Sequence, residues 1–286
     1  MPRTISDLKK YLEMVPELSS RMLLSYSHLA DGITNESYRL KFSKDEYVLK
    51  FFNHQAIDLG VDHKNEMRVM SRLEHLNITP TVIYIDLDEE FSVSRWIDGE
   101  YWRSADFSQP ELLHALVQRI KELHLTDTDG LHQVDLIERI HCYREKVIEK
   151  ERYPELTNIA IVSKVEAIIH ASRSEVDDCL CHNDILASNI INQDNIYLLD
   201  WEFAGVTCPY FELAVISRGN DFKDEQQDLL LRYYFGDTFE QHRDRFNQWQ
   251  CIYDYVALLW DLSLQETPED LTKQQKLALS RILHEL

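Results

Sequence analysis

Three polar side chains stand at fixed spacings in the middle of the chain: Asp184, Asn189 and Asp200, with His182 two residues before the first. Apolar, β-type residues flank this segment on both sides, so we expect the three side chains at the tips of a β-hairpin. One carboxylate could orient a hydroxyl group, and the amide and second carboxylate oxygens could hold Mg²⁺, which prefers oxygen ligands. Phosphoryl transfer needs such a set. The alternative is a loop with a buried histidine and capping Asp and Asn residues.

The order His-x-Asp-x-x-x-x-Asn, followed eleven residues later by Asp, resembles the catalytic loop and metal-binding Asp of kinases. Two residues in the amino-terminal third give independent support. Lys50 ends the expected strand Tyr47-Val-Leu-Lys50, like the strand lysine that contacts ATP phosphates, and Glu66 lies on the next expected helix, where it could form an ion pair with Lys50. Taken singly, a strand lysine often serves only to keep an edge strand from pairing with another chain, and a helix glutamate is usually exposed to solvent.

A polar turn between two expected strands, residues 31–37, is the candidate phosphate-covering segment. It contains a single glycine, so backbone amides and polar side chains, Thr34 and Asn35 among them, would have to do what glycines do in other phosphate loops. The alternative is an ordinary polar hairpin turn.

The elements that must position these residues fall into two groups. The first hundred residues predict an α+β unit built on an antiparallel sheet, with helices at 4–15 and 61–76 and strands at 22–29, 38–42, 47–52, 81–87 and 91–97. The remainder is helix-periodic at 109–124, 135–150, 155–172 and 209–286, with one β-like island at 179–200. We therefore expect two domains, 1–97 and 98–286, with a boundary near Arg95 to Gly99, and ligands favour clefts between such lobes.

Composition excludes several classes of function. The 286 residues carry 50 Asp and Glu against 30 Lys and Arg, a formal charge of -20, and such a surface repels nucleic-acid backbones and anionic lipid but attracts small cations. No apolar run approaches the roughly 20 residues that span a bilayer. The five cysteines do not form a disulfide framework, and Cys179 and Cys181 alone are a poor zinc pattern. We expect a cytoplasmic protein, and no protein partner is evident.

The sequence resembles the superfamily of choline/ethanolamine kinases, thiamine kinases and aminoglycoside phosphotransferases. The resemblance rests on Gly32-Ile-Thr-Asn35, Tyr47-Val-Leu-Lys50, Trp96-Ile-Asp-Gly99, His182-Asn-Asp184…Asn189, and the most specific block, Leu198-Leu-Asp-Trp-Glu-Phe-Ala-Gly205 followed by Pro209-Tyr-Phe-Glu-Leu-Ala214. It covers roughly residues 30 to 220 and is strongest for the choline and thiamine branch. It implies a bilobal protein-kinase-like fold, with a small antiparallel-sheet lobe and a larger helical lobe.

The resemblance also implies roles for single residues, with ATP and Mg²⁺ as cofactors. Asp184 would orient or deprotonate the substrate hydroxyl. Asn189 and Asp200 would bind Mg²⁺, with Glu202 as a further ligand or a partner for a cationic substrate. Lys50 would contact the α- and β-phosphates of ATP and be held by Glu66. The backbone groups of Arg95 and Ile97 would hydrogen-bond adenine.

The acceptor is expected to be a small molecule. Only eight residues, 201–208, separate Asp200 from Pro209, which is expected to open the next helix. A phosphorylatable activation segment with a peptide-docking surface needs a longer stretch of chain.

Aromatic residues near the carboxyl end suggest a cationic acceptor. Trp249, Tyr253 and Trp260 can share one helical face, and aromatic faces with carboxylates bind quaternary ammonium groups. The alternative is ordinary helix core. In the resembling family this helix carries a second tryptophan where Ser263 stands, and an acidic residue contacts the headgroup where Gly219 stands, with Asp221 as a substitute.

The leading interpretation is an ATP- and Mg²⁺-dependent kinase that phosphorylates the hydroxyl of a small cationic alcohol, most readily choline or ethanolamine. The alternatives are a thiamine kinase, an aminoglycoside-type phosphotransferase and a non-catalytic nucleotide-binding protein on the same fold. A metal-dependent hydrolase with His182, Asp184 and Asp200 as ligands has no further support, because a second histidine cluster at metal-ligand spacing is absent.

Overall fold

A computed structural model of the chain describes residues 3–29, 35–53, 59–86, 88, 90–151, 153–173, 177–265 and 270–285. The chain divides into two compact units. Unit 1 comprises Met1–Glu100 and Ile191–Glu202, and unit 2 comprises Tyr101–Ile190 and Phe203–Leu286.

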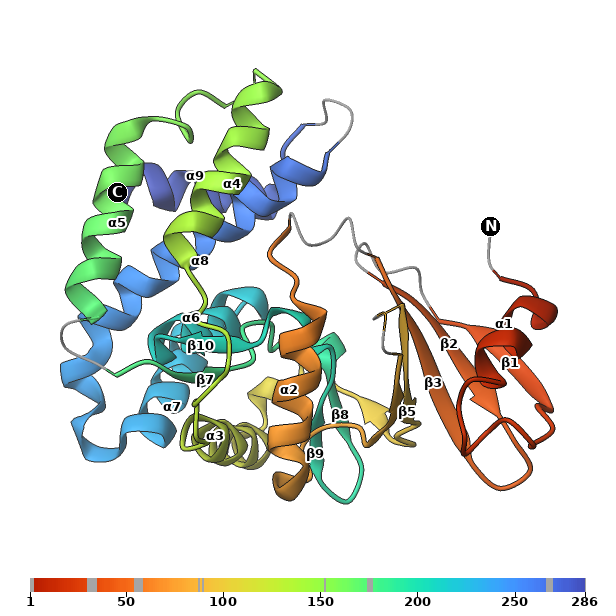
Figure 1. Ribbon diagram of the computed structural model, residues 1–286. Helices are drawn as coiled ribbons and strands as arrows, with labels where there is room; N and C mark the ends of the chain where they lie inside the picture. Colours follow the sequence, from red (N-terminus) through yellow and green to blue (C-terminus); the bar gives the residue numbers. More distant parts are fainter. Residues whose placement is uncertain are drawn as a thin grey trace. The chain divides into compact units, whose positions relative to one another are not determined.

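Unit 1 is built on an antiparallel five-stranded sheet with the order β1-β2-β3-β5-β4 (Figure 1). The strands are β1 (Ser25–His28), β2 (Asn35–Lys41), β3 (Glu46–Phe52), β4 (Val82–Ile85) and β5 (Phe91–Arg95). Lys50 lies on the central strand β3, opposite Ser37 of β2 and Ser92 of β5. The predicted sheet is therefore present, and the candidate phosphate-binding lysine lies in its middle.

Helix α1 (Ile5–Leu12) covers part of this sheet. The Thr4 hydroxyl accepts a hydrogen bond from the Asp7 amide, and the Asp7 carboxylate accepts one from the Thr4 amide, so the helix begins in a capping box. Leu8 and Leu12 then pack in the same core cluster as Leu49 of β3. The buried apolar stripe of α1 thus fixes the strand that carries Lys50.

Helix α2 (His63–Leu73), followed by the 3-10 turn η2 (Glu74–Leu76), matches the helix expected for residues 61–76. The Asp62 side chain caps it by accepting a hydrogen bond from the Asn65 amide at 2.9 Å. Glu66 lies in the first turn and is 2% exposed. A buried carboxylate of this kind needs a charged partner.

The strands β8 (Ile190–Asn192) and β9 (Ile196–Leu198) follow each other closely in the chain. The Leu198 amide donates to the Ile78 carbonyl at 2.8 Å, and Asn195 Nδ2 donates to the Asn77 carbonyl at 2.9 Å. These bonds attach residues 191–202 to unit 1, whereas the division at 97 and 98 assigns them to the second domain. The short strand β6 (Glu100–Tyr101) completes a small sheet with the order β6-β8-β9.

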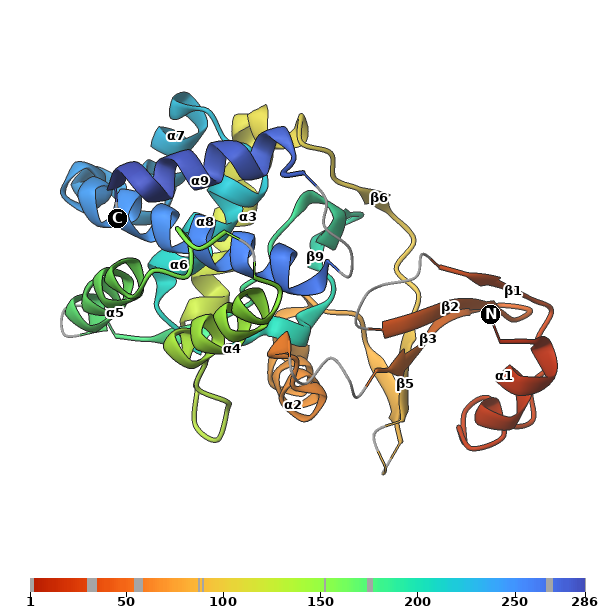
Figure 2. The same cartoon turned by 90° about the horizontal axis from the view of Figure 1, so that it is seen from above.

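Unit 2 is mainly helical, as expected. Its helices are α3 (Pro110–His124), α4 (Leu136–Glu149), α5 (Ile159–Arg173), α6 (Pro209–Gly219), α7 (Asp224–Phe235), α8 (Arg243–Leu264) and α9 (Lys273–Glu285), with the 3-10 turns η3 (Asp106–Ser108), η4 (Ala187–Asn189) and η6 (Gly236–His242). Residues 209–217 of α6 are all buried, so this helix forms the core of the unit. Figure 2 shows α9 lying alongside α8.

A short two-stranded sheet lies among these helices. Strand β7 (Cys179–Cys181) pairs antiparallel with β10 (Gly205–Thr207), and the 3-10 turn η5 (Trp201–Phe203) precedes β10. The Pro209 residue begins α6, as its position predicts. The β7 strand runs directly into the His182-Asn-Asp184 segment.

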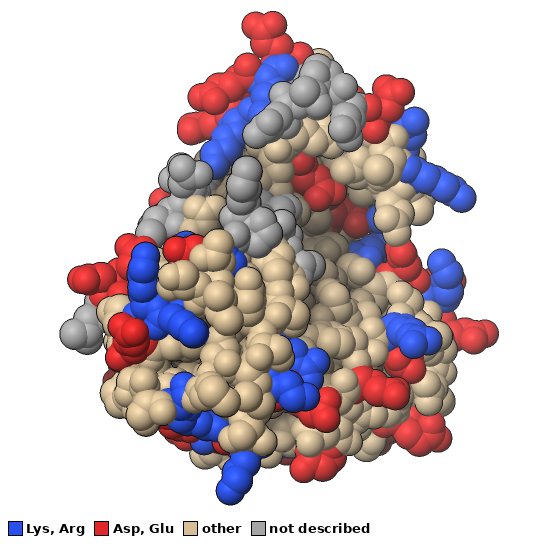
Figure 3. Space-filling model, turned by 90° about the vertical axis from the view of Figure 1, so that its right-hand side faces the viewer, with Lys and Arg blue, Asp and Glu red and all other residues tan. Residues whose placement is uncertain are grey.

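No helix among the described residues combines the length and the apolar character that crossing a membrane requires. On the face drawn in Figure 3, acidic side chains lie among basic ones rather than forming a patch of one sign.

Candidate active site

In unit 1, Lys50 forms two ion pairs. Its Nζ lies 2.8 Å from Glu66 Oε1 and 2.9 Å from Asp200 Oδ1. The side chain of Lys50 is 15% exposed and that of Glu66 is 3% exposed, whereas Asp200 is 41% exposed. The ion pair with Glu66 that the sequence suggested is therefore present, and Asp200 joins it.

The charge of Lys50 is stabilised by its surroundings. Burial acts to lower the pKa of Lys50, but the carboxylates of Asp200, Glu66 and Glu202 raise that pKa above its ordinary value. Burial acts to raise the pKa of Glu66, whereas Lys50 and a hydrogen bond with His63 bring it below its ordinary value. Both partners are thus charged at neutral pH.

Glu202 lies with this Lys50 cluster in unit 1. It is 5% exposed, and its Oε2 accepts a hydrogen bond from Asn35 Nδ2 at 2.5 Å. Asn35 is the first residue of β2 and is itself buried. Thr34, the neighbouring candidate for phosphate binding, lies outside the described residues. Asn35 therefore holds Glu202, whose charge acts on Lys50, while the predicted contact of Glu202 with a cationic substrate stays a prediction.

Arg95 and Ile97 lie at the end of β5 and just beyond it. The Arg95 amide donates to the Thr81 carbonyl at 2.8 Å, and its side chain forms an exposed ion pair with Glu17 at 3.0 Å. Because the Arg95 amide is already bonded, an adenine contact here requires the Arg95 carbonyl or the backbone of Ile97.

In unit 2, Asp184 and Asn189 are joined by hydrogen bonds. Asn189 Nδ2 donates to Asp184 Oδ2 at 2.8 Å and to the Asp184 carbonyl at 2.9 Å. Both side chains are partly buried. The amide nitrogen of Asn189 is therefore occupied, which leaves its oxygen Oδ1 as the atom that could contact a cation.

The backbone before Asp184 is held by a buried glutamate. Glu212 Oε1 accepts hydrogen bonds from the amides of His182 at 2.5 Å and Asn183 at 3.0 Å, and Glu212 is fully buried on α6. His182 is also fully buried, and its Nδ1 accepts a hydrogen bond from the Asp184 amide at 3.2 Å. His182 thus has a structural role, because its buried ring holds the loop through the Asp184 amide.

The role of Glu212 was not predicted from the sequence, although one signal was available. A carboxylate inside the apolar run Pro209-Tyr-Phe-Glu-Leu-Ala214 must be buried with partners. Burial acts to raise the pKa of Glu212, but the hydrogen bond and charge of His124 hold it below its ordinary value. The buried carboxylate is therefore ionised and can accept the two loop amides.

A pocket of about 200 Å³ in unit 2 contains two of the predicted substrate-binding residues, Asp221 and Tyr253. Asp254 lines it too, but Arg281 neutralises this carboxylate with bonds of 2.6 and 2.8 Å. The remaining lining residues are Arg218, Gly219, Ala257, Leu258, Asp261, Gln274, Gln275, Leu277, Ala278 and Arg281. We call this the acidic pocket.

Two carboxylates of the acidic pocket have neutral hydrogen-bond donors. Gln274 donates to Asp221 at 2.7 Å, and Gln275 donates to Asp261 at 3.0 Å. Burial, together with the charges of Asp184, Asp254, Asp261 and Asp221, raises the pKa of Tyr253. The charge of Asp184 therefore acts on the same tyrosine as the carboxylates of the pocket. A cation bound beside Tyr253 would be attracted by all of these negative charges.

Gly219 explains a departure from the resembling family. A Cβ atom at this position would lie 2.5 Å from Leu186 Cδ2 and 3.0 Å from Tyr253 Oη. An acidic side chain therefore does not fit beside Tyr253 without displacing its neighbours. Asp221, two residues further on, lines the pocket instead.

The other two predicted aromatic contacts, Trp249 and Trp260, have different surroundings on α8. Trp249 is 1% exposed, and its Nε1 donates to Ser172 Oγ at 3.0 Å, so its ring packs in the core of unit 2. Trp260 is partly buried, and its buried Nε1 has no hydrogen-bond partner among the described residues. Of the three predicted aromatic residues, only Tyr253 lines the acidic pocket. Asp261, next to Trp260, was not predicted.

The predicted metal ligands fit Mg²⁺ by the chemistry of their donor atoms. Asn189 offers Oδ1, and Asp200 offers a partly exposed carboxylate, and both are oxygen ligands of the kind that Mg²⁺ prefers. The Asp200 backbone adopts φ 62°, a left-handed conformation that Asp and Asn tolerate better than most residues. Asn189 belongs to unit 2 and Asp200 to unit 1.

Comparisons with known proteins show which family this chain is similar to. The model of the phosphotransferase enzyme family matches residues 25–249. A LicA homolog of Metamycoplasma hominis is 25% identical over 210 residues, which cover 73% of this chain and 79% of the relative. Ethanolamine kinase 2 of Mus musculus is 25% identical over 233 residues, which cover 71% of this chain and 58% of that kinase.

The fold is also that of a solved kinase. The crystal structure of choline kinase LicA from Streptococcus pneumoniae matches with a TM-score of 0.79 and 20% identity, over 97% of this chain and 98% of that one. This similarity confirms the kinase-like α+β fold predicted from the sequence.

Proposed function

Because the chain belongs to the phosphotransferase enzyme family, we propose that it transfers the γ-phosphoryl group of ATP to the hydroxyl of a small cationic alcohol. Choline and ethanolamine are the preferred acceptors. The observation that carries this proposal is the acidic pocket in unit 2, where Asp221, Asp261 and Tyr253 lie together and the charge of Asp184 acts on Tyr253.

In the proposed reaction, unit 1 contributes the groups that bind the nucleotide. Lys50, kept charged by Glu66 and Asp200, contacts the phosphates and neutralises part of their charge. Asn189 and Asp200 would each offer an oxygen ligand to Mg²⁺, and the bound ion would neutralise charge on the phosphoryl oxygens. The backbone at Arg95 and Ile97 hydrogen-bonds the adenine.

Asp184 orients the acceptor. Its Oδ2 is fixed by Asn189, and its other oxygen can accept the hydroxyl proton of the alcohol as the new oxygen–phosphorus bond forms. The bond between the γ-phosphorus and the bridging oxygen breaks at the same time, and ADP leaves. The hydrogen bonds that the backbone amides of His182 and Asn183 donate to Glu212 keep the loop in place. Such positioning, together with charge neutralisation, is the main source of catalysis in phosphoryl transfer.

The acidic pocket favours a small cation as the acceptor. Asp221 and Asp261 are bonded to neutral amides, so their charges remain for a ligand, and the face of Tyr253 can add a cation–π contact of about 0.5–2 kcal/mol. The pocket volume of about 200 Å³ lies below the roughly 300–1,000 Å³ of drug-sized sites. This size favours choline or ethanolamine over an aminoglycoside, with thiamine as the next candidate.

The test is a kinase assay with a panel of acceptors. The purified chain is incubated with ATP and Mg²⁺ and with choline, ethanolamine, thiamine or kanamycin, and ADP release and phosphorylated product are both measured. We expect the highest kcat/KM for choline or ethanolamine. Phosphorylation of kanamycin or thiamine alone would overturn the acceptor assignment, and nucleotide binding without any product would support the non-catalytic alternative.

A further inference from the structure

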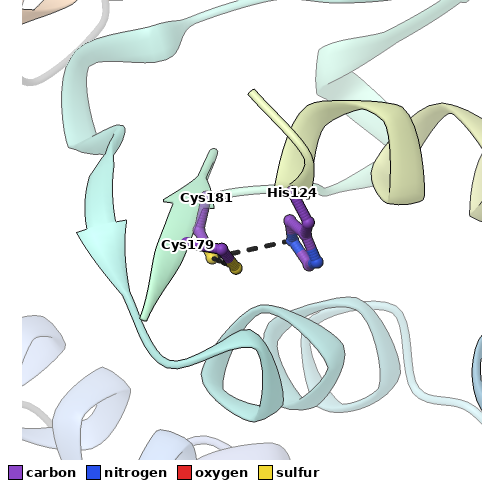
Figure 4. Close-up of side chains that lie close together, drawn as sticks. All are labelled: His124, Cys179 and Cys181. Carbon is purple, nitrogen blue, oxygen red and sulfur yellow. Dashed lines mark hydrogen bonds between the residues drawn. The ribbon is translucent and has the colours of Figure 1, made fainter. Parts of the chain in front are cut away.

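Three side chains of unit 2 outside the proposed reaction, His124, Cys179 and Cys181, lie together. Cys179 and Cys181 are the first and last residues of β7, and the two-residue period of a strand directs both side chains to the same face. His124 is the last residue of α3. Figure 4 shows the three side chains pointing toward one another. Their ligand atoms all lie within 4.8 Å of one another.

The distances within this cluster suit a tetrahedral metal ion. Cys179 Sγ and Cys181 Sγ are 3.6 Å apart, and Cys181 Sγ is 3.6 Å from His124 Nε2. Zinc bonds of about 2.3 Å to sulfur and about 2.0 Å to nitrogen, at tetrahedral angles, place the ligand atoms about 3.6–3.8 Å apart. Two of the three distances therefore already match the spacing that zinc requires, and the third lies within 4.8 Å, although Cys179-Leu-Cys181 is a poor zinc motif in the sequence.

The surroundings orient these ligands. His124 Nδ1 lies 2.7 Å from the Tyr234 hydroxyl, so the second ring nitrogen has the hydrogen-bond partner that metal-binding histidines usually have. Glu212 Oε2 lies 2.5 Å from His124 Nε2, while Glu212 Oε1 accepts the two loop amides. Cys181 and Glu212 are fully buried, and Cys179 is partly exposed, which provides a route for an ion to enter.

We propose that His124, Cys179 and Cys181 bind one zinc ion. Each thiol that becomes a ligand releases its proton to solvent, and the charged His124 ring releases the proton on Nε2 so that this atom can bind zinc. The hydrogen bond between His124 Nε2 and Glu212 is then replaced by a bond from Nε2 to zinc. The site lies at the end of β7 that enters the Asp184 loop, so the ion would stabilise the base of this loop.

The experiment measures metal binding and needs no enzyme activity. The reduced chain is freed of metal with a chelator and titrated with Zn²⁺ against a chromophoric competitor, and separately with Co²⁺. We expect one equivalent of zinc, a rise in Tm on zinc binding, and a Co²⁺ complex with thiolate-to-metal charge-transfer bands and intense tetrahedral d–d bands. Less than stoichiometric binding, or a Co²⁺ spectrum without thiolate bands, would overturn the proposal.

Matched cysteine variants locate the site. Cys179→Ser should weaken zinc binding at least about tenfold, whereas Cys142→Ser, at an exposed cysteine on α4, should leave it unchanged. Equal affinities of the two variants would contradict the assignment. Alkylation of the wild-type chain, mapped by mass spectrometry, supplies a readout that does not depend on the folding of a variant. Zinc should protect Cys179 but not Cys142, and a Cys179–Cys181 disulfide that persists with zinc under reducing conditions would exclude the site.

Discussion

The position of Asp184 depends on hydrogen bonds to both its side chain and its backbone. Asn189 holds the carboxylate, His182 accepts the Asp184 amide, and Glu212 accepts the two preceding amides. The His-x-Asp-x-x-x-x-Asn spacing placed Asp184 and Asn189 in one loop, because all of its members lie within eight residues, but it did not predict the hydrogen bond between them. Glu212 comes from a helix 28 residues further along the chain, so no local pattern could pair it with the loop.

Asp184→Asn should abolish turnover while leaving nucleotide binding largely intact. The amide keeps the shape of the side chain but cannot accept the acceptor proton, so we expect kcat to fall by about 10²–10⁴-fold. Steady-state kinetics gives kcat, and calorimetric titration with a non-hydrolysable nucleotide gives the affinity. Asp194→Asn, at an exposed residue between β8 and β9, is the control and should behave as wild type. Normal turnover of the Asp184 variant would show that its assigned role is wrong.

Asp261→Asn should raise the KM for choline with little change in kcat or in the KM for ATP. The variant keeps an oxygen that can accept the hydrogen bond from Gln275, but it removes one negative charge from the acidic pocket. We expect a several-fold effect, on the order of 1 kcal/mol. Asp237→Asn, at an exposed residue of η6 outside the pocket, serves as the control. Equal KM values in the two variants would place the cation elsewhere.

At the scale of elements, α2 supplies a buried acid to the strand that carries Lys50. The pKa of Glu66 is lower in the folded chain than the ordinary value of 4.5. Its stabilising contribution is therefore complete above the unfolded pKa and is lost as the pH falls through the lower, folded pKa. The pair thus stabilises the protein at neutral pH and ceases to do so in acid.

Glu66→Gln should lower the free energy of unfolding by about 1–3 kcal/mol at pH 7, since Lys50 keeps Asp200 as a partner. The difference between wild type and variant should shrink as the pH falls below 4.5 and should vanish once Glu66 is protonated. Urea unfolding across this pH range measures the free energy of unfolding of both proteins. Glu74→Gln, at an exposed residue of η2, should show no such difference. If the difference in the free energy of unfolding had the same size at every pH, the ion pair of Glu66 with Lys50 would not be its cause.

Local patterns predicted most elements, but not all of their partners. The helix expected for residues 61–76 is found as α2 and η2, and the strand at 47–52 is found as Glu46–Phe52. The single β-like island at 179–200, by contrast, is split. Its strand β7 pairs with β10 in unit 2, whereas most of β8 and β9 belongs to unit 1. A pattern of apolar residues shows which face is buried but does not identify the pairing strand, and β10 has only three residues.

At the scale of the whole molecule, the formal charge of -20 affects the two proposed substrates in opposite ways. A negative surface raises the local concentration of a cationic alcohol and lowers that of ATP. Composition could predict this effect because net charge is a property of the whole chain. It could not place the acidic pocket, whose carboxylates come from residues as far apart as Asp221 and Asp261.

Added salt should therefore shift the two KM values in opposite directions. Between about 0.01 and 0.5 M KCl the Debye length falls from about 30 Å to a few ångströms. We expect the KM for choline to rise a few-fold and the KM for ATP to fall, because salt screens the attraction of one substrate and the repulsion of the other. The neutral isostere 3,3-dimethylbutan-1-ol, measured as a competing ligand over the same range, controls for general salt effects and should keep its affinity. If choline and the isostere responded alike, the charge of the acceptor would play no part in its binding, and the acidic pocket would lose its assigned role.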